Sequence, residues 1–293
     1  MGEEKAKKIL VTGKESYIGT SFEKWLQQWP DDYVVDTVDM IGDEWRNKSF
    51  KGYDVVFHVA GIAHVSADPK MEGLYYKVNR DLAIETAQKA KNDGVKQFIF
   101  MSSIIIYGSD GRIGEKKVIL KDTIPQPENF YGRSKLEADL AIQKMEGNGF
   151  KSVIIRTPVV YGPSCKGNFP RLVTLAKICP VFPDIENERS MIYIDNLCEF
   201  LKLCIDNEVS GVFFPQNSDY ISTKEIIKSV RMHLGKRTLV VGLFNSLLQL
   251  LSQRIGFINK VFGNKTYDMS ISSDFKTQYN IVEFQESIEK SLV

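Results

Sequence analysis

The sequence predicts an α/β fold, a doubly wound parallel sheet followed by a smaller C-terminal part. Short apolar, β-branched runs alternate with longer amphipathic stretches through the first half of the 293 residues. The first apolar run also stops at a glycine that leads directly into a helix-like stretch. Alternating strands and helices are typical of parallel sheets, because each parallel connection has to cross the sheet. The chain is long enough for such a core and a second small domain.

The first strand–turn–helix unit begins with the apolar run Lys8–Val11 and turns at Gly13. An amphipathic stretch, Thr20–Trp29, follows the turn. Such a turn directs backbone N–H groups and the positive end of a helix dipole towards a pyrophosphate. Counted from Gly13, the glycine fingerprint of Rossmann dinucleotide-binding folds keeps Gly19, but Ser16 occupies its second position. We interpret Ser16 as a tolerated small residue, and an ordinary βα turn is the alternative.

The second predicted strand, Tyr33–Asp39, ends in an acid twenty residues after Gly19. A carboxylate at this place accepts hydrogen bonds from the adenosine ribose and repels a 2′-phosphate. Asp39 therefore favours NAD(H). NADP(H) is the alternative, because Lys14 in the glycine turn carries the opposite charge. Asp36 is expected to point to the other face of the strand.

A third strand is predicted over Asp54–Gly61, and its small last residues allow a flat cofactor to approach the backbone. His58 lies inside this buried run, so we predict a hydrogen-bonded core histidine rather than a catalytic one. One long helix over Met71–Asn92 and a strand over Gln97–Met101 follow. The order strand, helix, strand extends the parallel sheet.

Tyr131 and Lys135 carry the clearest chemical signal in the chain. Residues four apart share one face of a helix, here predicted over Tyr131–Gly147. A nearby ammonium favours phenolate over phenol and lowers a tyrosine pKa from its usual value of ~10. The pair therefore predicts an acid–base group for interconverting a hydroxyl and a ketone.

The chain resembles the extended short-chain dehydrogenases/reductases that modify nucleotide sugars, over nearly all of its length. No single feature carries the resemblance, but their order and spacing together do. The features are the turn Thr12-Gly13, the strand Asp54–Ala60, Asn79, the segment Ser102–Gly108, the pair Tyr131 and Lys135, the strand end Arg156–Pro163, and Arg189–Asp195.

The resemblance implies a role for each matching residue. Tyr131 would be the acid/base on the sugar oxygen, while Lys135 would tune its pKa and bind the nicotinamide ribose. Ser103 would hydrogen-bond the reacting oxygen. Asn79 would lie near the active centre, with simple bonding to backbone as the alternative. The residues expected to contact the cofactor are Gly13, Ser16, Tyr17, Ile18, Gly19, Asp39, Ala60, Gly61, Tyr131, Lys135 and Pro158.

Two further residues are expected to bind the nucleotide sugar. The resemblance implies that Arg189 clamps its diphosphate, which suits a guanidinium fork. A surface ion pair with Glu186 or Glu188 is the alternative for this arginine. Asn168 matches an asparagine that contacts substrate in related enzymes. The implied substrate is a UDP-sugar.

Smaller signs concern the reaction. The 4,6-dehydratases of this family place an Asp-Glu pair directly after the catalytic serine or threonine, where this chain has Ile104 and Ile105. Aliphatic side chains move no protons, so dehydration is disfavoured. Epimerases at carbon 4 often carry an asparagine where this chain has Val159, which counts modestly against them.

Three segments most resemble 4-keto reductases of the UDP-N-acetylquinovosamine type: Phe57–Val65, Gly162–Phe169 and Asn187–Ser190. We therefore predict reduction of a UDP-4-keto-6-deoxy-N-acetylhexosamine for surface polysaccharide synthesis. A UDP-hexose 4-epimerase is the alternative. A dinucleotide-binding sensor without turnover is a remote alternative, disfavoured because Ser103, Tyr131 and Lys135 are all present.

Composition is consistent with a cytoplasmic enzyme. A net charge of +1 and the absence of a basic, aromatic-interleaved stripe argue against nucleic acid. The polar start, Met1–Lys5, is not typical of a signal peptide, and the four cysteines have neither paired nor metal-ligand spacing. Polar residues interrupt the apolar stretch Leu243–Phe262, so no membrane partner is expected, and its apolar residues are predicted to be core.

The predicted domain boundary lies near Tyr161, where the strand–helix alternation gives way to irregular sequence. Residues 1–160 would form the NAD(P)-binding Rossmann domain, to which 189–214 would return. Residues 161–293 would form mainly the substrate-binding domain. The family resemblance implies a homodimer through the helices Met71–Asn92 and Tyr131–Gly147.

Overall fold

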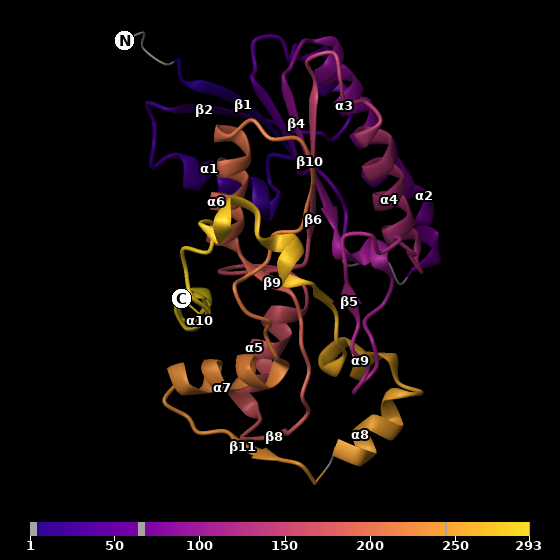
Figure 1. The fold of residues 1–293 in the computed structure, drawn as a ribbon, viewed down its shortest axis with the longest axis vertical. Helices are drawn as coiled ribbons and strands as arrows, with labels where there is room; N and C mark the ends of the chain where they lie inside the picture. Colours follow the sequence, from indigo (N-terminus) through magenta and orange to yellow (C-terminus); the bar gives the residue numbers. More distant parts are fainter. Residues whose placement is uncertain (1–4, 64–67, 244, 293) are drawn as a thin grey trace. The chain divides into compact units, whose positions relative to one another are not determined.

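The computed structural model describes residues 5–63, 68–243 and 245–292, which Figure 1 draws in sequence colours. The described residues form two compact units. The first contains the chain up to Gly108, Ile124–Thr157 and Cys198–Pro215, and the second contains Ser109–Thr123, Pro158–Leu197 and the chain from Gln216 onwards.

A six-stranded sheet forms the centre of the first unit. Its order is β10-β6-β4-β3-β1-β2, and every neighbouring pair is parallel. The predicted α/β fold is therefore confirmed. Only β2 lies on one side of β1, while the later strands lie on the other. The order in which strands are added to the sheet thus reverses between β1 and β3. The strands are β1 Lys7–Thr12, β2 Tyr33–Val38, β3 Val55–His58, β4 Gln97–Ser103, β6 Lys151–Thr157 and β10 Gly211–Phe213.

Helices cover both faces of this sheet, with α1 and α6 on one face and α3 and α4 on the other (Figure 1). Alanines on α3 and α4 are buried, and these small side chains let the helices lie close to the apolar strands. The helical elements of this unit are α1 Tyr17–Leu26, η1 Glu44–Asn47, α3 Leu82–Asn92, η4 Ile104–Tyr107, α4 Phe130–Gln143 and α6 Ile194–Asp206, whose first four residues belong to the second unit.

The predicted helix Met71–Asn92 is a continuous helical segment, but it is not α-helical throughout. It begins with η2 Pro69–Met71 and α2 Glu72–Tyr75, widens into the π-helical turn η3 Tyr76–Asp81, and continues as α3. A π-turn inserted into an α-helix is rare and is frequently found at functional sites. Here it contains the fully buried Asn79.

The second unit has three two-stranded parallel pairs: β7 Val159–Tyr161 with β9 Met191–Tyr193, β8 Val181–Pro183 with β11 Leu239–Val241, and β5 Val118–Ile119 with β12 Thr266–Tyr267. Its core includes the fully buried Tyr161, whose hydroxyl hydrogen-bonds Ser287 at 2.7 Å. Among the described residues, no helix combines the length and apolar character that crossing a membrane requires. The remaining elements are α5 Asn168–Ile178, α7 Thr223–His233, α8 Asn245–Ser252, α9 Gly256–Phe262, η5 Met269–Ser272, η6 Asp274–Thr277 and α10 Phe284–Ser291.

Candidate active site

The loops after β1 and β3 meet at the place where the strand order reverses. Gly13 has a φ of +95°, and a Cβ on it would lie 2.9 Å from the Cα of Ala60. Only glycine allows this conformation and this approach of two backbones. In open α/β sheets, ligands bind at the carboxyl ends of the strands at such a switch point. Gly13 and Ala60, both predicted to contact the cofactor, therefore lie together at this switch point.

Ser16 is more than a tolerated replacement for a glycine. It is the N-cap of α1, and its Oγ accepts a hydrogen bond from the Gly19 N–H at 3.1 Å. A Cβ on Gly19 would lie 2.5 Å from that Oγ, so a larger residue at position 19 would have to displace the serine hydroxyl. Tyr17 and Ile18 begin the helix, whose positive end lies beside Gly13. This arrangement fits the pyrophosphate of a dinucleotide.

The two acids around the end of β2 have different surroundings. Asp39 follows the strand and is exposed, and its Oδ1 accepts a hydrogen bond from the Ile41 N–H at 2.9 Å. Asp36 accepts a hydrogen bond from the Tyr53 hydroxyl at 2.6 Å. Asp39 is therefore the acid at the carboxyl end of the strand, where the predicted ribose contact requires it.

His58 is a core residue, as predicted. It is fully buried at the end of β3, its Nδ1 lies 2.8 Å from the Thr12 Oγ1, and its ring stacks on Phe98 and Phe100. Burial lowers its pKa to about 3, and the nearby Lys135 charge acts in the same direction. A neutral imidazole inside the sheet is not available for proton transfer at the carboxyl ends of the strands.

Asn79 holds the loop after β3 in place. Its amide accepts a hydrogen bond from the Ile62 N–H and donates one to the Ile62 carbonyl, both at 2.9 Å. A Cβ on the adjacent Gly61 would lie 3.0 Å from the Asn79 Oδ1 and 3.4 Å from the Lys135 Nζ. The structure thus brings Asn79, Gly61 and Lys135 together, and it gives Asn79 a positioning contact with backbone.

Ser103 and Tyr131 meet at the carboxyl end of β4. Their side chains share a hydrogen bond, and the Tyr131 ring packs edge-on against Tyr75 with 5.6 Å between the ring centroids. Although Tyr131 keeps some exposure, burial raises its pKa to about 12, and the bond to Ser103 acts in the opposite direction. The prediction of a lowered tyrosine pKa is wrong here, because loss of hydration outweighs the stabilisation of phenolate.

Lys135 lies one turn after Tyr131 on α4, as predicted, but it is nearly buried, at 7% exposure. Its Nζ donates a hydrogen bond to the Met101 carbonyl at 2.8 Å and lies 4.8 Å from the centroid of the Phe100 ring. Burial lowers the Lys135 pKa to about 8, while the charge of Asp139 favours the protonated form. The ammonium is therefore held by the end of β4 as well as by its own helix.

A buried ion pair that the sequence reasoning missed supports this helix. Asp139, one turn after Lys135, makes two 3.0 Å hydrogen bonds with the guanidinium of Arg156 and accepts a third from Ser102 at 2.8 Å. Arg156 also donates to the Tyr107 hydroxyl at 2.7 Å. An acid four residues after Lys135 was a readable signal, because it has to lie on the same helix face.

In the second unit, Arg189 is engaged by protein groups. Its guanidinium donates to the Gly263 carbonyl and to the carboxylate of Asp110, both at 3.1 Å. The predicted alternative, a pair with Glu186 or Glu188, is not the one formed, since these two acids pair with lysines. A diphosphate would have to compete with Asp110 for this arginine.

Asn168 and Pro158 are the other two residues of the second unit that were predicted to bind substrate or cofactor. Asn168 is the exposed first residue of α5, and Pro158 is buried directly after β6. Their roles stay predictions.

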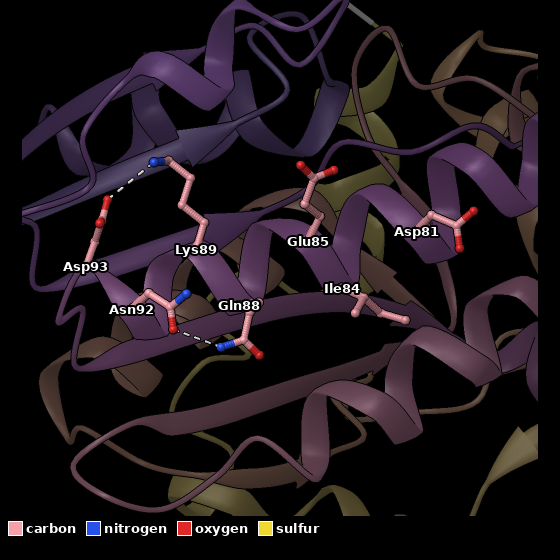
Figure 2. A pocket seen from close by; sticks show the side chains of 7 residues that line it. All are labelled: Asp81, Ile84, Glu85, Gln88, Lys89, Asn92 and Asp93. Carbon is pink, nitrogen blue, oxygen red and sulfur yellow. Dashed lines mark hydrogen bonds and ion pairs between the residues drawn. The ribbon is translucent and has the colours of Figure 1, made fainter.

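A hollow on the described surface does not belong to this site. Figure 2 shows it along the solvent face of α3, with a volume of about 610 Å³. All its lining side chains come from η3, α3 and the residue that follows, and none is a predicted site residue. They are Asp81, Ile84, Glu85, Gln88, Lys89, Asn92 and Asp93.

Comparisons with known proteins agree with this geometry. Residues 9–213 match the profile of the NAD dependent epimerase/dehydratase family. A UDP-glucose 4-epimerase of Vibrio cholerae is 32% identical over 256 residues, which are 79% of this chain and 77% of the relative. An Escherichia coli O157:H7 relative, N-acetyl-alpha-D-glucosaminyl-diphospho-ditrans,octacis-undecaprenol 4-epimerase, is 24% identical over 88% of this chain and 81% of its own.

Solved structures share the fold at lower identity. The UDP-glucuronic acid 4-epimerase from Bacillus cereus, in complex with NAD, superposes with a TM-score of 0.74 at 21% identity, covering 97% of this chain and 94% of that one. The profile match covers more than half of the chain, and the Vibrio relative is similar over most of its length. This chain therefore belongs to the NAD dependent epimerase/dehydratase family, as its motifs predict.

Proposed function

We propose that this protein is an NAD-dependent oxidoreductase that acts at carbon 4 of a UDP-hexose. One observation carries the proposal: Tyr131 is hydrogen-bonded to Ser103, at the carboxyl end of β4, and lies one helical turn before Lys135 on α4. Family membership and the Vibrio and Bacillus proteins, both sugar-nucleotide 4-epimerases by name, support the substrate class. When bound, NAD would supply the hydride acceptor or donor.

The protein groups can move the proton that accompanies this hydride. Because the pKa of Tyr131 is raised to about 12, its phenol keeps its proton at neutral pH. When hydride reaches carbon 4 of a ketone, Tyr131 gives this proton to the developing alkoxide, which becomes the hydroxyl. Ser103 would orient the same oxygen by a hydrogen bond. The ammonium of Lys135, near Gly61, would bind the ribose on the nicotinamide side.

We propose reduction of a UDP-4-keto-6-deoxy-N-acetylhexosamine as the reaction. The protonated phenol suits a ketone substrate, and the three reductase-like segments and Val159 agree with it. The last two residues of the segment Phe57–Val65 lie outside the described residues. Ile104 and Ile105 follow Ser103 directly in η4 and have no carboxyl group, so the proposal does not include elimination of water.

A 4-epimerase is the second candidate, and the relatives favour it. Both the Vibrio and the Escherichia relatives are named as 4-epimerases. An epimerase would use Tyr131 twice, first as base and then as acid. The ketone would be a transient that rotates in the site and is then reduced on its other face. The two candidates differ in whether the ketone is the substrate, with oxidised cofactor released, or a transient, with the cofactor never released.

One experiment separates the candidates. The purified protein is supplied with UDP-4-keto-6-deoxy-N-acetylglucosamine and NADH, and separately with UDP-glucose or UDP-N-acetylglucosamine without added cofactor. A reductase consumes NADH in step with the ketone, and NMR identifies the 4-hydroxyl product. Interconversion of gluco and galacto sugars with no net change in nicotinamide absorbance would assign the epimerase instead. Binding of NADH with neither reaction would support a sensor and contradict the proposal.

A further inference from the structure

Helix α8 presents an apolar face to solvent. Leu243, Leu247 and Leu250 are 84%, 54% and 63% exposed. Leu247 and Leu250 are three residues apart on α8, the spacing of one helix face, and Leu243 precedes the helix by two positions. The prediction that the apolar residues of this stretch are core is therefore wrong for these three leucines.

The opposite face of α8 is already turned to the protein. Ser252 is buried, and Gln249 and Ser252 line a hollow of about 220 Å³ together with Arg112 and Glu115 of the same unit. Rotating the helix to bury the leucines would therefore expose residues that now face the protein. The leucines lie on the face of α8 that points to solvent.

Further exposed apolar side chains lie on the neighbouring strands. Leu239 of β11 is 61% exposed and pairs with Val181 of β8, which is 43% exposed. Ile178, at the end of α5, is 71% exposed. Within the second unit, β8, β11 and α8 lie along one edge (Figure 1). Exposed apolar side chains that gather along one edge of a unit are typical of an interaction site.

The segment that contains β11 and α8 is basic. Between Ile226 and Tyr267 the sequence has seven lysines and arginines and no Asp or Glu. Lys236, Arg237 and Arg254 are exposed. Acids of other segments also lie beside α8. Glu115 lines the hollow with Gln249, and the Asp184 carbonyl accepts a hydrogen bond from the Asn245 side chain while its carboxylate is paired with Lys224 at 2.7 Å. Basic side chains outnumber these acids.

We propose that this basic apolar face docks on the surface of an anionic lipid bilayer. The face consists of Leu239, Leu243, Leu247 and Leu250 with Lys236, Arg237 and Arg254. Leucine side chains would enter the boundary between headgroups and acyl chains, and the basic side chains would lie against lipid phosphates. A helix of eight residues lies along this boundary and does not span it.

The positive charge of this face favours an anionic lipid surface over a second copy of the chain as the partner. In a two-fold dimer the same patch meets itself, so the basic residues of one copy would lie against an equally basic patch of the other. Like charges brought together in this way oppose association. An anionic membrane offers the opposite charge over an extended surface, together with an apolar layer for the leucines.

Co-sedimentation of the full chain with vesicles tests the proposal. Vesicles of phosphatidylcholine and phosphatidylglycerol should bind the protein, and vesicles of phosphatidylcholine alone should bind it more weakly. Added salt should weaken the binding, because it screens the basic residues. The double variant Leu247→Gln/Leu250→Gln should lose about tenfold or more in partitioning. Arg254→Gln should lose about fivefold, on anionic vesicles alone.

A matched control pair lies elsewhere in the same unit. Leu120 and Ile281 are 48% and 47% exposed but belong neither to α8 nor to the pair β8 and β11. Leu120→Gln/Ile281→Gln should leave vesicle binding unchanged. A second readout is Leu247→Trp, whose emission should shift to the blue with anionic vesicles.

Three results would overturn the proposal: no binding to anionic vesicles, equal loss in the control pair, or a dimer in light scattering that Leu247→Gln/Leu250→Gln dissociates. The last result would assign the face to a second copy. Turnover of a water-soluble nucleotide sugar is measured without vesicles, so failure of membrane docking and failure of the proposed reaction are distinguished. The docking proposal does not rest on the reaction.

Discussion

Replacing Asp139 by asparagine should destabilise the first unit and change the pH dependence of activity. The substitution keeps the size of the side chain but removes its charge. It leaves the guanidinium of Arg156, only 8% exposed, without the carboxylate that accepts two hydrogen bonds from it. The guanidinium has lost most of its hydration, and without the carboxylate only neutral acceptors such as the Tyr107 hydroxyl remain to it.

The magnitude follows from burial. Removing one partner of a buried ion pair costs about 3–5 kcal/mol. The same helix supplies a matched control, because Glu137 pairs with Arg80 at 2.9 Å while their side chains are 47% and 33% exposed. An exposed pair contributes at most about 1 kcal/mol, so Glu137→Gln should have a small effect. For a chain of this size, Asp139→Asn should lower Tm by on the order of 10 °C.

The effect on activity has a defined sign. Asp139 favours the protonated form of Lys135, whose pKa burial lowers to about 8. Without that charge the pKa of Lys135 falls further, and its cation is lost at a lower pH. Since the proposed role of Lys135 needs the cation, the alkaline limb of the pH profile of kcat/KM should move to lower pH. Glu137→Gln should leave this limb in place.

Urea unfolding and pH–rate profiles of the two variants test this reasoning. If Asp139→Asn lowers the free energy of unfolding no more than Glu137→Gln does, the assignment of a stabilising buried ion pair is refuted. An unchanged alkaline limb in a folded Asp139→Asn variant would remove Asp139 from the tuning of Lys135. Replacing both partners, as Asp139→Leu/Arg156→Met, should recover much of the lost stability, because no unpaired charge remains.

Three further predictions concern single side chains. Tyr131→Phe should lower turnover by about 100-fold or more while NADH binding, followed by fluorescence, stays unchanged, and near-normal turnover would remove Tyr131 from the mechanism. The protein should bind NADH more tightly than NADPH, and Asp39→Ala should narrow the gap; calorimetry that finds NADPH tighter in the unchanged protein would contradict this. Gly19→Ala should lower both Tm and NADH affinity, because its Cβ would lie 2.5 Å from the Ser16 Oγ, whereas a variant with both values intact would show that the turn yields easily.

Features encoded by neighbouring residues could be predicted from the sequence. The strand predicted over Tyr33–Asp39 is observed over Tyr33–Val38, and Tyr131 and Lys135 share one face of α4 as expected. Alternation, turn chemistry and helical spacing are local properties, so they are readable in one sequence. The cap formed by Ser16 also had a local signal, since a serine before a helix that bonds the N–H three residues on is an ordinary N-cap.

Features set by distant partners could not be predicted. Asp110, which engages Arg189, lies 79 residues away in the chain, and the Met101 carbonyl that holds Lys135 lies 34 residues away. The raised pKa of Tyr131 depends on how much water the folded site excludes, a quantity that residue types do not specify. The leucines of α8 have the same spacing whether a face meets the core or solvent, so their exposure needed the structure.

The π-helical turn η3 makes one residue of this helical segment dispensable for the helix but not for the site. Before the turn, Tyr75 packs against Tyr131, and after it Ala83 and Ala87 pack in the core. A π-helical turn holds one residue more than an α-helical turn, while the flanking turns keep their phase. Deleting one residue from η3 would therefore restore regular α-helical winding and leave the contacts of both flanks in place. The deletion would instead remove the widened turn that contains Asn79, so it should disturb the loop after β3, which Asn79 holds, more than it disturbs the packing of the helix.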